Sequence, residues 1–144
     1  MIGRLFSGET QRVLENALRA SGLAHEVIAH NLANVDTPGY KRSEVVFQDK
    51  LAAALAAAQD GDNQLKGTRT NARHLPVGDI PAPGDIQAET VVRAETSLRA
   101  DGNNVDLDAE IVKLSENTML YQALAQIVKM RMTQLRSAIS EGRR

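Results

Sequence analysis

An unbroken apolar ladder near the C-terminus constrains this chain more than any other feature. Its members are separated by alternating steps of four and three residues, and they are Leu107, Ile111, Leu114, Thr118, Tyr121, Ala125, Val128, Met132, Leu135 and Ile139. This spacing keeps one stripe of an α-helix apolar over its whole length and is typical of a coiled-coil seam. Asp106 stands just before the ladder, where it can cap the helix. The sequence therefore predicts one long helix across residues 105–144.

A second amphipathic segment occupies residues 1–35. Its main apolar stripe also alternates steps of four and three, through Val13, Ala17, Ala20, Ala24 and Val27. Small side chains on such a stripe let a partner helix approach closely. We expect this segment to pack antiparallel against the C-terminal helix as a coiled coil.

The middle of the chain, residues 36–104, is less regular. SEVVFQDKLAAALAAAQ, at 43–59, is rich in Ala and Leu and favours a short helix. Periodicity is then lost; a weak strand pattern covers about 86–98, and DGNN at 101–104 is typical of a turn. The fold class predicted is mainly α, with two long terminal helices, a short middle helix and an irregular segment that can hold a small β-hairpin.

Composition excludes several classes of function. A formal net charge of −1 gives no general attraction to nucleic acid or to anionic lipid. Without cysteine there is no disulfide, thiol nucleophile or thiolate metal site. No stretch of the sequence approaches a membrane span, and MIGRLFSGETQRVLENAL lacks the unbroken apolar core of a secretory signal. We expect no membrane insertion, and no cleaved signal peptide if the protein leaves the cytoplasm.

The nearest approach to an enzyme signature is His25, Glu26 and His30. A zinc-binding helix carries its histidines four residues apart, whereas these two are five apart and therefore separated by about 140° around a helix. We expect no metal, no cofactor and no catalytic site. A metal-dependent hydrolase is kept as an alternative of a different class, which metal analysis of the protein would test.

A helix terminator, NLANVDTPGYK, lies at residues 31–41. Proline disfavours helical geometry at Thr37, Pro38 fixes one turn dihedral, and Gly39 can adopt the positive φ that a type II turn requires. Asn31 and Asn34 can bond the last carbonyls of the helix or a packed neighbour. The residues expected to form this terminator are Asn31, Asn34, Pro38, Gly39 and Tyr40.

NLANVDTPGYK resembles the signature shared by rod and hook proteins of the bacterial flagellum. DGNNVDLDAEIVKLSENTMLYQALAQIVKMRM, at 101–132, and TNARHLP, at 70–76, are similar to proximal rod members of the flagellar basal-body rod protein family. The resemblance covers both ends and part of the centre, but not about 77–100. Another rod protein of the same family is the nearer alternative.

The resemblance implies a structural axial subunit that is made in the cytoplasm, leaves through the flagellar type III export apparatus and joins the rod in the periplasmic space. The partners implied are copies of itself, other rod proteins, and membrane-ring and export-gate components at the rod base. Phe47 and Leu51 have the spacing of a short export-gate motif of this class, although the same spacing also fits simple packing within a helix. The two apolar ladders would then form the assembly seam.

Overall fold

The computed structural model describes residues 8–59, 81–94 and 99–141. In chain order its elements are α2 (Gly8–Ala33), β1 (Ser43–Val46), α3 (Gln48–Gln59), the short 3-10 helix η1 (Pro83–Asp85), β2 (Glu89–Val92) and α4 (Leu107–Glu141). The predicted mainly α fold with two long helices toward its ends is confirmed. TNARHLP lies outside the described residues.

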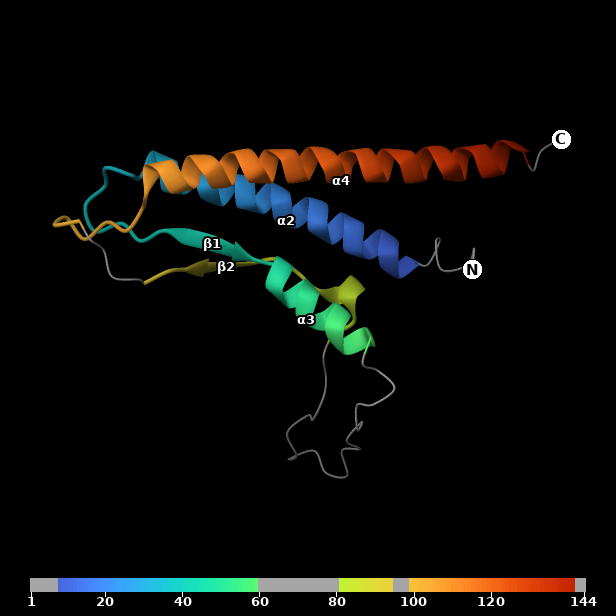
Figure 1. The fold of residues 1–144 in the computed structure, drawn as a ribbon, viewed down its shortest axis with the longest axis horizontal. Coiled ribbons are helices and arrows are strands. Elements are labelled where there is room, and N and C mark those ends of the chain that lie inside the picture. Colours follow the sequence, from blue (N-terminus) through green and yellow to red (C-terminus); the bar gives the residue numbers. More distant parts are fainter. Residues whose placement is uncertain (1–7, 60–80, 95–98, 142–144) are drawn as a thin grey trace, which may run out of the picture.

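The two long helices run antiparallel and in contact (Figure 1). α4 has 35 residues and α2 has 26, and the C-terminal end of α4 reaches past the first turn of α2. The start of α4 is set by Asp106, whose Oδ1 accepts the backbone N–H groups of Asp108 and Ala109 at 3.0 and 3.3 Å. This is the N-cap that the sequence predicted.

A two-stranded antiparallel sheet and α3 lie on the other side of α2 from α4 (Figure 1). In the sheet Ser43 pairs with Val92, and Val46 pairs with Glu89. The short helix expected over 43–59 therefore begins only at Gln48, because SEVV is β1. β-Branched residues such as Val45 and Val46 favour a pleated strand when a partner strand is present. The strands do not form a tight hairpin, since the whole of α3 separates them along the chain.

The buried apolar core sits between α2, α3 and the segment before β2. Its centre is formed by Ala20, Phe47, Ala54 and Ile86. Leu51 and Ala17 pack against this cluster from α3 and α2. None of these residues comes from α4, so α4 is held by other contacts.

The first turns of α2 are braced by η1. Arg12 forms an ion pair with Asp85 at 3.0 Å, and Asn16 Nδ2 donates to the carbonyl oxygen of Gly84 at 3.0 Å. A Cβ at Gly84 would lie 3.4 Å from the Cβ of Arg12. A methyl group at position 84 would thus be in van der Waals contact with α2, which shows how close the 3-10 turn lies to the helix.

Candidate functional site

The terminator after α2 forms the expected turn. The backbone N–H of Tyr40 donates to the carbonyl of Thr37 at 3.3 Å, and Gly39 has φ 72°. Asn34 Nδ2 donates to the carbonyl of His30, an orphan acceptor of the helix end, at 2.9 Å. The turn is therefore built by the residue types that the motif supplies.

Asn103, in the turn before α4, completes the end of α2. Its side chain is fully buried, and its Nδ2 lies within hydrogen-bond distance of the carbonyl oxygens of Asn34, Val35 and Thr37, at 2.9, 3.0 and 2.9 Å. Its Oδ1 accepts the N–H of Val105 at 2.7 Å. One amide group thus joins three carbonyls of the turn after α2 to the segment before α4.

The two turns are also joined through their backbones. Gly39 N–H donates to the carbonyl of Asp101 at 2.9 Å, and Lys41 Nζ donates to the carbonyl of Gly102 at 2.6 Å. The N–H of Asn103 donates to Asp101 Oδ1, and this hydrogen bond lowers the pKa of Asp101. We call the contact between residues 37–41 and 101–104 the turn clasp.

Asn31 is the second buried hub. Its Nδ2 donates to the carbonyl of Ser43 at 2.8 Å and lies 2.9 Å from Glu110 Oε2, while its Oδ1 accepts the N–H of Ser43 at 2.9 Å and the hydroxyl of Tyr40 at 3.2 Å. Glu110 is 2% exposed, and its other oxygen accepts from Lys113 Nζ at 3.1 Å. This network ties the end of α2 to β1 and to the first turn of α4.

Asn104 extends the small sheet. Its Oδ1 accepts the backbone N–H of Arg42 at 2.7 Å, and its Nδ2 donates to the carbonyl of Arg93 at 2.8 Å. Arg93 in turn donates from Nε to Glu44 Oε2 at 2.9 Å, and this hydrogen bond lowers the pKa of Glu44. The segment before α4 is therefore fixed to both strands.

A reciprocal pair of polar residues fixes the crossing of the long helices. Ser21 Oγ donates to Asn117 Oδ1 at 2.8 Å, and Asn117 Nδ2 donates to the carbonyl of Ser21 at 2.9 Å. The residues of the predicted α2 stripe lie near this crossing: Ala20 and Val27 are buried, while Val13, Ala17 and Ala24 are half-buried. Sequence reasoning missed Ser21 and used Asn117 only as part of a resemblance.

The predicted seam of α4 faces to one side of α2, and α2 does not cover most of its large residues. Leu114 and Val128 are half-buried, but the other large seam residues are exposed: Leu107, Ile111, Tyr121, Met132, Leu135 and Ile139. The residues of α4 that bond to α2, Glu110 and Asn117, lie about 40 to 60° around the helix from the seam. Coiled-coil packing along the seam therefore stays a prediction.

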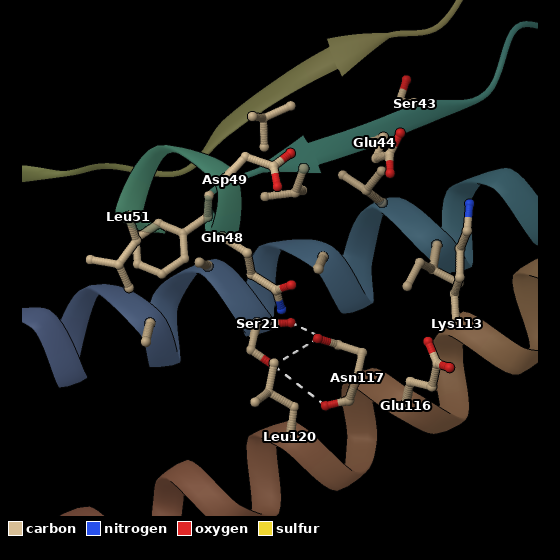
Figure 2. Close-up of a pocket in the computed structure, with 18 of the residues that line it drawn as sticks. Ser21, Ser43, Glu44, Gln48, Asp49, Leu51, Lys113, Glu116, Asn117 and Leu120 are labelled. Atoms are coloured by element: carbon tan, nitrogen blue, oxygen red, sulfur yellow. Dashed lines mark hydrogen bonds between the residues drawn. The ribbon is translucent and has the colours of Figure 1, made fainter. Parts of the chain in front are cut away.

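At the helix crossing lies a groove of about 720 Å³, lined in part by Ser21 and Asn117, which we call the α2–α4 groove (Figure 2). Its apolar lining includes Ala20 and Ala24 from α2, Val45 and Leu51 from β1 and α3, and Leu120 and Leu124 from α4. Polar residues surround this lining. Asp49 lies on the α3 side, and Glu116 lies on the α4 side.

The remaining candidates take ordinary positions. His25, Glu26 and His30 are all exposed on α2, and within the described ranges no three His, Cys, Asp or Glu side chains are grouped so that they could hold a metal ion. Phe47 is buried and Leu51 packs beside it in the core. Among the helices that the structure describes, none is long and apolar enough to cross a membrane.

The chain is similar to known proteins along almost its whole length. A family model described as flagella basal body rod protein matches residues 12–41, which include most of α2 and the turn. Flagellar basal body rod protein FlgB of Bacillus subtilis (strain 168) is 34% identical over 139 residues, with 96% of this chain and 98% of the relative covered. The protein of the same name from Escherichia coli (strain K12) is 32% identical over 111 residues, covering 77% of this chain and 78% of the relative.

Proposed function

Because this chain belongs to the FlgB family of flagellar basal body rod proteins, we propose that it builds the proximal rod by packing its exposed α4 surface against neighbouring rod subunits. The family is one of structural proteins, and the metal-dependent hydrolase reading of His25, Glu26 and His30 is not favoured. Neighbouring subunits are copies of this chain and other rod proteins.

The exposure of apolar residues on α4 carries this proposal. Met132 is 50% exposed and Ile139 is 72% exposed, although both belong to the predicted seam. A second set of exposed apolar residues lies off the seam, namely Val112, Met119, Leu120, Ile127 and Met130. A helix that is apolar on several faces is normally buried on several faces, and large exposed apolar patches mark interaction sites. In an assembled rod, neighbouring helices would cover these residues.

The route to the rod is part of the same proposal. Export through the flagellar type III apparatus, assembly in the periplasmic space, and contacts with membrane-ring and export-gate components at the rod base are inferred from the family. Phe47 and Leu51 lie in the core of the folded chain. If an exporter reads these two residues, it reads them before the chain has folded.

Substitution of exposed seam residues tests the proposal. Met132→Asp combined with Ile139→Asp should leave the thermal unfolding of the purified monomer nearly unchanged, because both sites are already in water. It should abolish incorporation into isolated basal bodies and stop swimming, because an interface would have to bury two unpaired carboxylates. Subunit secreted into the medium would be measured in parallel, since loss of export would also stop swimming.

Ser140→Asp is the matched control. Ser140 is exposed on the same helix, about 80° around it from Met132 and from Met130, so it lies between the two exposed apolar sets and this change should be tolerated. If the double variant is exported, assembles and swims, the seam is not an assembly surface. If Ser140→Asp is as harmful as the double variant, the helix does not assemble through its apolar faces.

A further inference from the structure

The α2–α4 groove carries acidic groups at its edge that have no cationic partner among the described residues. Glu44 and Glu110, deeper in the groove, are bonded to Arg93 and Lys113. Asp49 and Glu116 are exposed, and in the described part of the chain neither forms an ion pair or a hydrogen bond. The groove therefore combines an apolar floor with uncompensated negative charge on both of its walls.

The C-terminal part of α4 has the opposite character. Met132, Leu135 and Ile139 form its exposed apolar stripe, and Lys129 and Arg136 lie about 40 to 60° to one side of this stripe. Residues 117–140 contain no acidic residue. Neither cation forms an ion pair within the described residues, so the apolar stripe carries uncompensated positive charge along its edge.

The groove cannot receive this stripe from its own chain. α4 is one continuous helix over Leu107–Glu141, and it supplies Leu120 and Leu124 to the groove wall. A continuous helix cannot turn back into a groove that it lines. A C-terminal stripe that occupies this groove must therefore come from another molecule.

We propose that residues 129–139 of a second copy of this chain dock into the α2–α4 groove, with their apolar stripe on its floor and Lys129 and Arg136 facing Asp49 and Glu116. The inference rests on the proposed role as a rod subunit and adds to it a defined contact between neighbours. Groove and stripe are different surfaces of the same chain, so the contact is head-to-tail. Such contacts generate rings or open helical assemblies, as a tubular rod requires.

Cysteine pairing tests the contact directly, because the natural chain contains no cysteine. Two differently tagged copies, one with Gln48→Cys in the groove and one with Met132→Cys on the stripe, would be co-produced in cells that lack the natural subunit. After oxidation of isolated basal bodies, a disulfide-linked product carrying both tags is expected. Ser137→Cys, paired with Gln48→Cys, should give at least about tenfold less product, because residue 137 lies about 140° around the helix from residue 132.

Charge reversal tests the acidic edge. Asp49→Lys with Glu116→Lys should lower the yield of the 48–132 product by about tenfold or more, because like charges would face each other across the contact. Lys129→Glu with Arg136→Glu in the other copy should restore most of that yield. Both sites are exposed, and circular dichroism of each purified variant would verify that the fold is kept.

The outcomes separate the two proposals. If the chain is absent from basal bodies, the rod function fails and the docking inference falls with it. If the tagged copies are incorporated but positions 132 and 137 give equal yields, or the charge swap restores nothing, docking is overturned while the rod function stands. A photoreactive group at position 48 that captures a protein of different mass, and not a second copy, would overturn it as well.

Discussion

Gly39 and Gly102 lie against each other in the turn clasp, and both have positive φ, 72° and 75°. A Cβ added at Gly102 would lie 3.9 Å from the Cα of Gly39, whereas one added at Gly39 would meet nothing within 4 Å. Glycine is therefore favoured at position 39 by the backbone conformation, and not by a lack of space for a side chain. Since the clasp joins the end of α2 to the start of α4, strain at this point reaches both long helices.

Gly39→Val should destabilise the protein by about 1 to 3 kcal/mol, the usual cost of a non-glycine residue held in a strained conformation. Gly39→Asn should be milder, because Asn visits the left-handed region more readily. Urea unfolding of the two variants would give the free energies. Gly22→Ala serves as control, since Gly22 is helical with open space around it, and it should stabilise by about 0.5 to 1 kcal/mol. Equal effects of Val and Asn would contradict a conformational role.

Asn103→Ala should cost about 1 to 3 kcal/mol, because a fully buried side chain would lose its hydrogen bonds to the carbonyls of Asn34, Val35 and Thr37 and to the N–H of Val105. Asn103→Asp keeps the shape but replaces the donor with an acceptor, so it should be at least as harmful near pH 7. Thermal unfolding would measure both. Gln122→Ala, at an exposed site on α4, should change stability by no more than about 0.5 kcal/mol. An unaffected Asn103→Asp variant would show that the side chain is not needed as a donor.

Acid should weaken the sheet through Glu44. Because the Arg93 hydrogen bond lowers the pKa of Glu44 in the folded protein, the ionised side chain contributes stability above its ordinary pKa. That contribution is lost as pH falls through the lower pKa of the folded state. The melting temperature, measured from pH 6 down to pH 3, should therefore fall less steeply for Glu44→Gln than for the natural chain. The effect should be small, since Glu44 is partly exposed. If the melting temperatures of the two proteins fall in parallel with pH, the ionised Glu44 makes no pH-dependent contribution to stability.

Amide hydrogen exchange of the dilute monomer should divide α4 into two parts. The N-terminal half is bonded to α2 through Glu110 and Asn117, so its amides should be protected. Residues 132–140 are exposed throughout, and a helical end without packing frays readily. Assembly into rods should raise protection in that segment. Strong protection of residues 132–140 in the monomer would mean that the C-terminal end of α4 is a stable helix without packing against a neighbouring subunit.

The parts of the fold that could be read from sequence are those fixed by local chemistry. Alternating steps of four and three predicted both long helices, Asp106 marked the start of α4, and the Pro38 and Gly39 pair predicted the turn. Each of these depends on residues close together in the chain. SEVV was misread because its Ala-rich continuation favours a helix, while the strand depends on a partner at Glu89–Val92.

The rest depends on contacts between distant residues. Glu110 is an acidic residue in the first turn of α4, where solvent exposure is the usual state, yet it is buried beside Asn31. Asn103 looked like an ordinary turn residue. The orientation of α4 could not be predicted either, because a helix with several apolar faces does not specify which face its own chain covers. The polar residue Asn117, close to an apolar seam, was the available signal for the face that contacts α2.

The hydrogen bonds that complete α2 have a consequence for the order of events in a chain that emerges N-terminus first, from a ribosome or from a narrow channel. Asn103 bonds carbonyls 66 to 69 positions earlier, and Asn117 bonds a residue 96 positions earlier. Until those residues emerge, α2 lacks both its final cap and its crossing partner. Contacts of such long sequence separation close late. The chain therefore stays incompletely folded for most of its passage, and α2 and α4 can take their final places only once residues 103–117 have emerged.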